Sequence, residues 1–308
     1  MKGPIVVIDA ANGIGRGVVQ AVLNSGRPVI AVSPDQNELR ALRKRHAGAD
    51  FAAIAGSIAD ETSSAALAFR LCELDRPIAG IVIANCGEPV RGRVLDQTAQ
   101  ESQRRIENDL LPHIAAARQL LPVLSESGRN GGYVVIGSPG SEHPWAGYGY
   151  RSVAAAAVNM LVRVLHDEAR ALGVRVQMLA IGRPARTDEN RESACEGWPT
   201  ALAIGEQALA LIDQTEPRQA ANAVVPFVRN GLRAPAEIAA DAISQSEPSA
   251  DIDLLAAEPA LLAGMISKPN GAQAVDAAVG PDGQRYLDQA WALLEPLFSS
   301  KSNEANKS

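Results

Sequence analysis

The chain has few of the features that mark secreted, membrane-spanning or disulfide-bonded proteins. Its 308 residues include only three cysteines, Cys72, Cys86 and Cys195, and their spacing fits no metal site. We therefore expect a reduced, intracellular protein. No apolar run reaches the roughly 18 residues that a membrane helix needs, and the N-terminus lacks the order of a signal peptide. The sequence predicts a soluble, cytoplasmic protein without a membrane partner.

The chain also has only a small excess of charge of one sign and few histidines. The net charge is −6 with both signs spread along the chain, which argues against a nucleic-acid partner. The four histidines, His46, His113, His143 and His166, have no metal-ligand spacing, so we expect no metal site. We expect His46 and His166 on helix surfaces. His143 follows Ser138 in a predicted loop and is the histidine that we consider for a pocket.

What the chain does have is a regular alternation of short apolar runs and longer amphipathic segments. Runs rich in Val, Ile and Ala are typical of strands buried on both faces of a parallel sheet, and alternation with helices predicts a doubly wound α/β fold. The expected strands are Ile5–Ile8, Val29–Val32, Phe51–Ile54, Ile78–Ala84, Tyr133–Ile136, Val174–Ala180 and Asp251–Ala256. The expected helices are Gly15–Ser25, Gln36–His46, Thr62–Leu74, Thr98–Ser127 and Ser152–Leu172.

The segment VVIDAANGIGRG joins the first expected strand to the first expected helix. Gly13 and Gly15, with Asn12 and Ile14 beside them, would let the backbone approach a pyrophosphate at the N-terminus of the helix. The alternative is a glycine turn needed only to pack the helix on the strand. A glycine pattern alone is a weak signal, but the strand, turn and helix around it favour dinucleotide binding.

Six motifs in order resemble the short-chain dehydrogenase/reductase family. The turn resembles its T-G-x-x-x-G-x-G, and ANCG resembles its N-N-A-G, which places Asn85 and Gly87 near the cofactor. Asn108 stands where the family has an asparagine that holds a structural water, and Ser138, at the end of YVVIGS, stands at the catalytic serine. GVRVQMLAIGRPART and RAPAEIAADAI complete the series. The resemblance covers roughly residues 4–257 and implies a Rossmann-type parallel sheet of about seven strands.

The resemblance also divides the chain into segments. Residues 1–258 are expected to form the Rossmann-type domain, in which 183–231 is the substrate lid. Residues 259–298 are expected to form a C-terminal helical extension and 299–308 a disordered tail. One apolar helical face in the extension is predicted from Leu287, Trp291, Leu294 and Phe298.

At the family's catalytic positions this chain has other residues. Members of the family place a tyrosine about thirteen residues after the serine, which exchanges a proton with the substrate, and a lysine four residues later, which lowers the pKa of that tyrosine. Here these positions hold Arg151 and Ala155. Arginine stays protonated and cannot replace a phenol as an acid. Tyr148 is an alternative proton donor if Arg151 faces it; otherwise Tyr148 and Tyr150 pack in the loop.

The resemblance implies NAD or NADP as the cofactor, but several contacts differ. Asp9 stands at the first glycine of the turn, where its carboxylate would repel a phosphate unless a cation such as Arg16 offsets it. Ser33 and Pro34 stand where an acid favours NAD or an arginine favours NADP, and Ser57 stands where an aspartate contacts adenine. We therefore expect dinucleotide binding to be weak, altered or lost.

Two kinds of function follow from these observations. The first is a divergent oxidoreductase-like protein that binds or transforms a small molecule without the usual hydride-transfer mechanism, non-redox chemistry included. The second is a catalytically inactive relative that serves as a binding, regulatory or structural subunit. Arg151 favours an anionic ligand such as a carboxylate. A homodimer or homotetramer is expected through the helices Thr98–Ser127 and Ser152–Leu172, as is common in the family.

Overall fold

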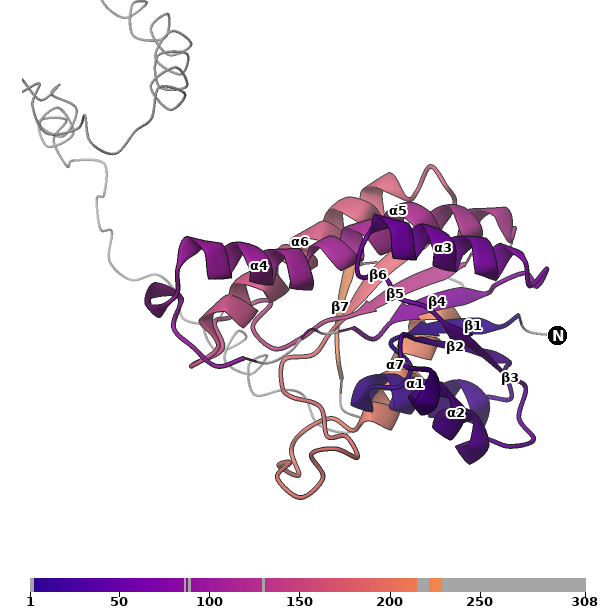
Figure 1. Cartoon of the computed structure of the whole chain (residues 1–308), viewed down its shortest axis with the longest axis horizontal. Coiled ribbons are helices and arrows are strands. Elements are labelled where there is room, and N and C mark those ends of the chain that lie inside the picture. Colours follow the sequence, from indigo (N-terminus) through magenta and orange to yellow (C-terminus); the bar gives the residue numbers. More distant parts are fainter. Residues whose placement is uncertain (1–2, 86, 88–89, 129–130, 215–221, 229–308) are drawn as a thin grey trace, which may run out of the picture. The chain divides into compact units, whose positions relative to one another are not determined.

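A computed structural model of the protein describes residues 3–85, 87, 90–128, 131–214 and 222–228. Seven strands form one sheet in the order β3-β2-β1-β4-β5-β6-β7, and each neighbouring pair is parallel (Figure 1). The strands are β1 (Ile5–Ile8), β2 (Val29–Ser33), β3 (Phe51–Ala55), β4 (Gly80–Ile83), β5 (Gly132–Ile136), β6 (Arg175–Ala180) and β7 (Val224–Pro226).

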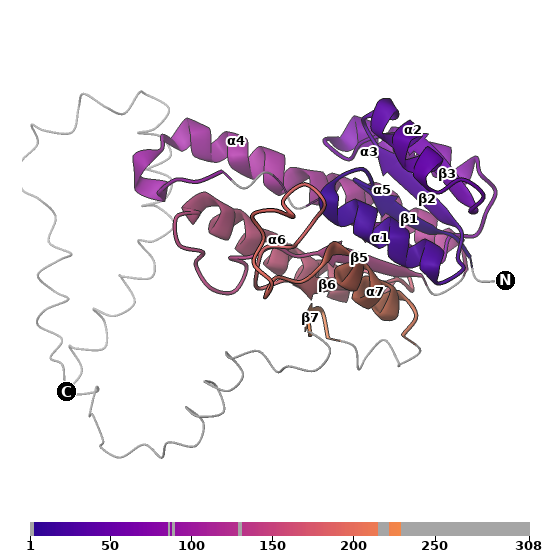
Figure 2. The ribbon, with the colours of Figure 1, turned by 90° about the horizontal axis from the view of Figure 1, so that it is seen from below.

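Helices cover both faces of the sheet. Figures 1 and 2 show α1, α2 and α7 on one face, and α3, α5 and α6 on the other, where α4 continues the layer. A short 3-10 helix, Val94–Asp96, precedes α4. The α-helices are α1 (Gly13–Asn24), α2 (Gln36–Arg45), α3 (Glu61–Cys72), α4 (Ala99–Asp109), α5 (Leu111–Glu126), α6 (Gly149–Glu168) and α7 (Ala201–Ile212).

The apolar strands are buried because helices pack on both of their faces. Successive side chains of a strand point to opposite faces, so Val6 belongs to one apolar cluster and Ile5 and Val7 to the other. Leu120 of α5 packs in the first cluster and Val18 of α1 in the second. This arrangement explains why the strand sequences are nearly continuous runs of Val, Ile and Ala.

The direction in which the chain adds strands reverses at β1. Ile8, the last residue of β1, pairs with Val32 of β2 on one side and with Ile83 of β4 on the other. Open α/β sheets bind their ligands in the crevice that forms at the carboxyl ends of the strands at such a reversal. The fold therefore places the β1–α1 turn and the segment after β4 at one common site.

The predicted parallel sheet of about seven strands is confirmed, but one helix and one strand of the fold differ from the prediction. The expected helix Thr98–Ser127 is split at Leu110 into α4 and α5. Pro112, in the first turn of α5, has no backbone N–H and is suited to the start of a helix. The seventh strand, β7, lies within residues 183–231, which were expected to form only the lid.

The last motif of the series and the segments after it are not covered by the described residues. Helix α7 precedes β7, and RAPAEIAADAI lies outside the described residues, so its place before a last strand stays a prediction. All described residues belong to one unit, Met1–Asp241. The expected strand Asp251–Ala256, extension 259–298 and tail 299–308 lie outside them, so the predicted domain limits stay predictions. In the ranges that are described, no helix has both the length and the hydropathy to cross a bilayer.

Candidate functional site

A cleft of about 520 Å³ lies at the carboxyl ends of the central strands. Its volume is within the range of pockets that bind small molecules and cofactors. The cleft is lined by the β1–α1 turn, the segments that follow β4 and β5, the start of α6 and the segment after β6. It brings together five of the residues predicted to bind a cofactor, namely Asn12, Gly13, Ile14, Asn85 and Gly87.

The β1–α1 turn is held by the side chain of Asn12. The Asn12 Oδ1 accepts a hydrogen bond from the Gly15 N–H at 2.6 Å, and Nδ2 donates to the Asp9 carboxylate at 2.5 Å and to the Ala84 carbonyl at 3.2 Å. A Cβ at Gly15 would overlap the carbonyl oxygen of Asp9, so the turn needs glycine there. The turn thus brings open backbone to the N-terminus of α1, where the helix dipole favours an anion.

Asp9 occupies the place of a glycine in both sequence and conformation. Its φ of 60° lies in the left-handed region that glycine adopts with little strain. Burial raises the pKa of the Asp9 carboxyl, the hydrogen bond from Asn12 opposes this, and Glu38 and Glu189 raise the pKa further. A raised pKa favours the neutral acid, which weakens the repulsion that the sequence predicts between Asp9 and a phosphate.

The segment after β6 lies against the same turn. A Cβ at Gly13 would be 2.6 Å from the Cβ of Thr187, so the Thr187 side chain sits directly beside this glycine. Glu189 forms an ion pair with Arg16 of α1, with 2.9 Å between the Arg16 Nη2 and the Glu189 Oε1. Arg16, which the sequence suggested as the cation that offsets Asp9, is therefore already paired with another carboxylate.

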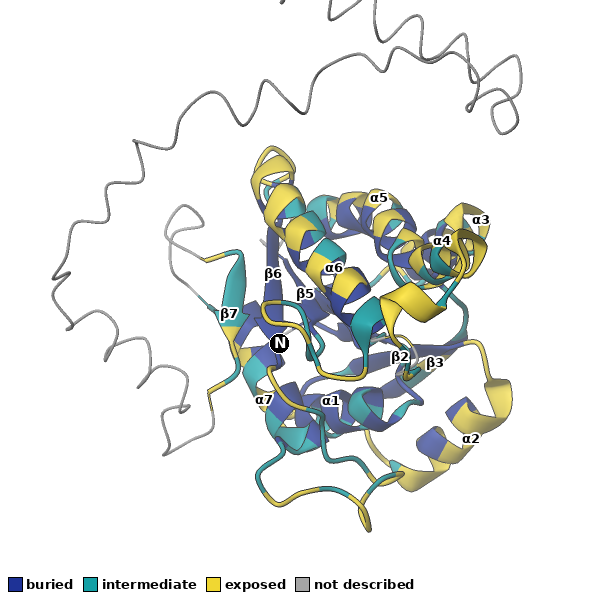
Figure 3. Cartoon of the chain, turned by 90° about the vertical axis from the view of Figure 1, so that its left-hand side faces the viewer, coloured by how far each residue is buried: buried dark blue, intermediate teal, exposed yellow. Residues whose placement is uncertain are grey.

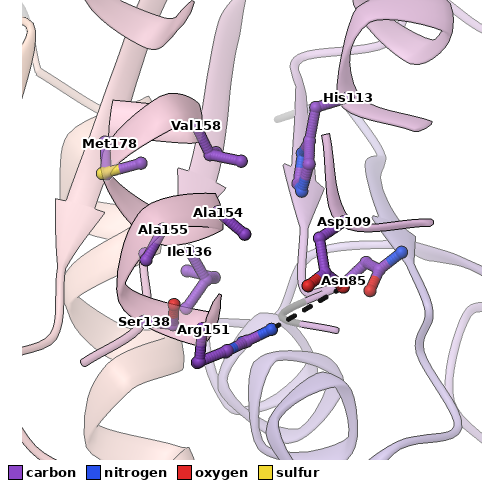
Figure 4. Close-up of a pocket in the computed structure, with 11 residues that line it drawn as sticks. Asn85, Asp109, His113, Ile136, Ser138, Arg151, Ala154, Ala155, Val158 and Met178 are labelled. Carbon is purple, nitrogen blue, oxygen red and sulfur yellow. Dashed lines mark ion pairs between the residues drawn. The ribbon is translucent and has the colours of Figure 1, made fainter. Parts of the chain in front are cut away.

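A smaller cavity of about 20 Å³ lies among α4, α5, α6 and the ends of β5 and β6 (Figure 4). This volume is about what one buried water needs. Ser138, Asn85 and Arg151 line both this inner cavity and the outer cleft, so they form the boundary between the two. Ala155, at the family's lysine position, lines only the inner cavity.

Arg151 comes from the first turn of α6, and its side chain is only 7% exposed. Its Nη1 lies 3.9 Å from the Oδ1 of Asp109, the last residue of α4 (Figure 4). Both side chains pack against Gly87, whose φ is 64° and where a Cβ would overlap both groups. Gly87 was predicted for cofactor binding, and it is also required by this ion pair.

Asp109, one position after the predicted Asn108, is the residue of α4 that lines the inner cavity. Asn108, the predicted residue, is exposed and lines neither cavity. Burial raises the pKa of the Asp109 carboxyl, and the neighbouring Arg151 and Arg105 oppose that shift. The proline of the next helix, Pro112, was the signal that could have revealed the helix end and placed Asp109 at the site.

His113 is the second residue that was missed. It is 6% exposed, lines the inner cavity, and its Nδ1 has no hydrogen-bond partner among the described residues. Burial lowers the pKa of His113 to about 4, with a further contribution from Arg151, so the ring is neutral near pH 7. His143 instead is exposed and lines neither cavity, while His166 is buried, with its Nδ1 2.7 Å from the Val176 carbonyl. The described residues contain no cluster that could hold a metal.

The two tyrosines at the start of α6, Tyr148 at its N-cap and Tyr150 in its first turn, contact residues other than Ser138. Tyr148 accepts a hydrogen bond from the Arg91 Nε at 2.9 Å and stacks on Trp145 with 4.0 Å between ring centroids. The Tyr150 hydroxyl is hydrogen-bonded to Ser102. Neither tyrosine lines a cavity, and Arg151 contacts Asp109 rather than Tyr148. In the described part of the chain, no tyrosine therefore lines a cavity that contains Ser138.

Comparisons with known proteins agree with this fold. The family described as short chain dehydrogenase matches residues 4–195. A ketoacyl reductase, HetN of Nostoc sp., is 24% identical over 228 residues, which are 73% of this chain and 75% of the relative. A structure of a short chain oxidoreductase from Pseudomonas aeruginosa, with NADPH bound and an atypical catalytic center, has 21% identity and a TM-score of 0.64 and covers 75% of this chain and 97% of its own.

An oxidoreductase of the short chain dehydrogenase/reductase family from Burkholderia thailandensis is also similar, with 21% identity and a TM-score of 0.63 over 74% of this chain and 91% of its own. At such identities these structures support the fold alone. The family match spans more than half of the chain, from β1 through β6 into the segment beyond. The chain therefore belongs to the short-chain dehydrogenase family, as an oxidoreductase-like member.

Proposed function

We propose that the chain binds a nicotinamide dinucleotide in the outer cleft and binds or transforms a small molecule beside Ser138 without the usual tyrosine–lysine pair. One observation carries this proposal. In the described part of the chain, no tyrosine and no lysine lines either cavity, and Arg151 and Ala155 occupy their places on α6. The scaffold of the site is retained while its proton donor is replaced.

The β1–α1 turn suits a dinucleotide. Gly13 and Ile14 begin α1 and line the cleft, and their backbone N–H groups would hold the pyrophosphate. Asn85 and Ser138, at the ends of β4 and β5, would hold the nicotinamide half. When bound, the dinucleotide supplies or accepts a hydride. The structure from Pseudomonas aeruginosa has both NADPH and an atypical catalytic center, which supports dinucleotide binding by this fold beside an atypical center.

We propose that this binding is weak. Asp9 and Glu189 place two carboxyl groups at the cleft, and the guanidinium of Arg16 is paired with Glu189. A phosphate must therefore compete with Glu189 for Arg16 and lie close to Asp9. Both effects reduce the electrostatic attraction that the start of α1 provides.

The residues beside Ser138 define what chemistry remains. The Ser138 hydroxyl can donate a hydrogen bond to a substrate oxygen, and Arg151 can stabilise negative charge that develops on that oxygen. Arginine does not release its proton at ordinary pH, so a proton for the product must come from water. Positioned proton donors contribute about 10²–10⁴ in rate. We therefore expect any carbonyl reduction to be slower by about that factor than in members with the tyrosine.

A catalytically inactive binding or regulatory subunit is the second candidate. The contact of Thr187 with Gly13 and the ion pair between Arg16 and Glu189 favour it. These side chains lie where a pyrophosphate would bind, and a ligand must displace or accommodate them. In this case the cleft would serve a small ligand or a partner rather than a dinucleotide.

Calorimetric titration with NADH and NADPH separates the two candidates. Measurable binding of either nucleotide supports the first, and no binding at millimolar concentration supports the second. Activity is then compared between the wild type and Arg151→Tyr with Ala155→Lys, with each single variant as a control. The substrates to be tested are ketones, alcohols and a ketoacyl thioester. The thioester is included because HetN is described as a ketoacyl reductase. Ordinary turnover by the wild-type protein would contradict the proposed loss of the tyrosine–lysine mechanism.

A further inference from the structure

The Arg151 guanidinium is a buried cation whose hydrogen-bond donors are not used. Its side chain is 7% exposed, and its nearest carboxylate atom, Asp109 Oδ1, is 3.9 Å from Nη1, which is too far for a hydrogen bond. The guanidinium makes no hydrogen bond to another described residue. An arginine carries five N–H donors, and no nitrogen of Arg151 is among the fully buried side-chain atoms that lack a partner, so its donors face the cleft that it lines.

The position of Arg151 makes these donors available to a ligand. Arg151 lines the outer cleft as well as the inner cavity, together with Ser138 and Asn85. In Figure 4 the guanidinium extends from α6 toward Asp109 and Asn85, while Ser138 lies beside the base of the same side chain. A ligand that enters the cleft at Ser138 would therefore meet the guanidinium directly.

The surroundings of Arg151 add positive potential on the cleft side. The first turn of α6 has no acidic residue, and its cap residue, Tyr148, makes no side-chain hydrogen bond to it. The positive end of the helix dipole thus coincides with the arginine. His113 of α5 faces the pair from the inner cavity and is neutral because burial lowers its pKa to about 4. Asp109 is the one described carboxylate within ion-pair distance of Arg151.

We propose that Arg151, with the Ser138 hydroxyl and the Asn85 amide, binds the carboxylate of a small organic acid. The planar guanidinium matches a carboxylate through two parallel hydrogen bonds. Asp109 and Gly87 hold the guanidinium at the boundary of the two cavities, so Asp109 is a positioning residue. This inference rests on the proposed function, because it names the class of small molecule that the same site would bind.

The test measures carboxylate binding in the absence of a dinucleotide. Pyruvate and benzoate are titrated into the full-length protein at pH 7 by calorimetry or ligand-observed NMR, with pyruvamide and benzamide as neutral analogues of the same shape. We expect the acids to bind at least tenfold more tightly than the amides. Arg151→Gln should abolish this difference, and Arg151→Lys, which keeps the charge without the planar fork, should retain part of it.

Arg91→Gln is the matched control, because Arg91 is an exposed cation near the start of α6 that lines neither cavity. It should keep the full difference between acids and amides. Circular dichroism and thermal unfolding of each variant confirm that it is folded. If Arg151→Gln fails to fold, the Arg151→Lys variant decides the question. If this variant prefers acids over amides as strongly as the wild type does, the planar guanidinium is not what binds the carboxylate.

Three results would overturn the proposal. These are equal affinity for acids and amides, no detectable binding of either acid, and a preference that persists in Arg151→Gln but disappears in Arg183→Gln, because Arg183 is another cation of the cleft. Parallel titration with NADPH keeps the two proposals apart. Carboxylate binding without NADPH binding supports this inference and contradicts the proposed cofactor. NADPH binding without carboxylate binding supports the proposed cofactor and contradicts this inference.

Discussion

The β1–α1 turn and the start of α6 line the same cleft but differ in what they retain. At the turn, Gly13 and Gly15 keep the backbone path of a dinucleotide site, and the glycines are required by steric contacts. At α6, Arg151 and Ala155 stand at the positions that the sequence analysis assigns to the tyrosine and lysine of the family, and we propose that they replace these reactive side chains. The difference indicates that functions carried by backbone shape persist with the fold, whereas functions carried by side chains are exchanged.

The exchange that we propose at α6 involves more than Arg151 and Ala155. Arg151 is accompanied by Asp109 at the end of α4 and by Gly87 after β4, which leaves room for both. The buried charge would be strongly destabilising without a partner. A lone substitution of the tyrosine by arginine would therefore be costly, and the group Arg151, Asp109 and Gly87 behaves as one structural unit.

The largest expected effect concerns His113, at the inner side of this unit. Its folded pKa of about 4 lies below the usual value of 6.5, so its stabilising contribution is complete above about pH 6.5 and is lost as the pH falls toward 4. The difference corresponds to about 3 kcal/mol. We expect urea unfolding to show that the wild type loses up to about 3 kcal/mol more than His113→Phe between pH 7 and pH 4.

The exposed His143 gives the control variant, His143→Phe. Equal pH dependence in the wild type and His113→Phe would mean that the ring of His113 is not kept neutral by burial. The buried, unpartnered histidine would then have to be placed differently in the inner cavity.

The second test concerns the turn and compares one added methyl group at two glycines. A Cβ at Gly15 overlaps the backbone of Asp9, whereas a Cβ at Gly182 meets no atom within 4 Å. Overpacking of this kind costs about 1–3 kcal/mol. Gly15→Ala should lower the unfolding free energy by about that amount and weaken NADPH binding, while Gly182→Ala should change neither. Full stability of Gly15→Ala would show that the turn can open without loss.

These positions also show how far the sequence alone could lead. The sheet was predictable because β1 to β5 consist mainly of Val, Ile and Ala, and β6 is mostly apolar. The glycines of the turn were predictable from their place between a strand and a helix. β7 has only three residues and stands in a Pro- and Ala-rich segment, so its pattern is too short to recognise. The ion pair of Arg151 with Asp109 joins two helices, and a shift of one residue from Asn108 was enough to hide it.

A third prediction tests the acidic character of the turn. The pKa of Asp9 is raised chiefly by burial, so the carboxyl becomes neutral as the pH falls and its contribution to stability is lost as the pH rises through the folded value. Asp9→Asn keeps a hydrogen-bond acceptor for Asn12 without the charge. We expect it to bind NADPH up to about tenfold more tightly at pH 8, or about 1.4 kcal/mol, and the gain should shrink at low pH.

Asp167→Asn is the matched control, because it removes one exposed carboxylate at the far end of α6. It should leave the affinity for NADPH unchanged at both pH values. If Asp9→Asn binds no better than the wild type at pH 8, the weak binding proposed here must have a cause other than the charge of Asp9.

The outer face of α6 offers a fourth test, on assembly. Val153, Met160 and Val164 are exposed at helical spacing on this helix, and Figure 3 shows its exposed outer side opposite the buried side. Ala156 is exposed on the same face. We expect Ala156→Trp to shift the protein toward monomer in light scattering, while Ala171→Trp, beyond the end of α6, should not. A monomeric wild-type protein would contradict the predicted homodimer or homotetramer.

The smallest effect is expected at Tyr148, and it decides whether the comparison of the two regions is complete. If Tyr148 acted as the missing acid, the start of α6 would keep the family's chemistry in a displaced form. The hydroxyl of Tyr148 instead accepts a hydrogen bond from Arg91 and lines neither cavity. Tyr148→Phe should therefore lower stability only slightly, because the bond that it removes is to an exposed side chain, and it should leave ligand binding and any turnover unchanged. A loss of turnover by about 10²-fold or more, with ligand affinity preserved, would show that Tyr148 reaches the substrate and acts as the acid.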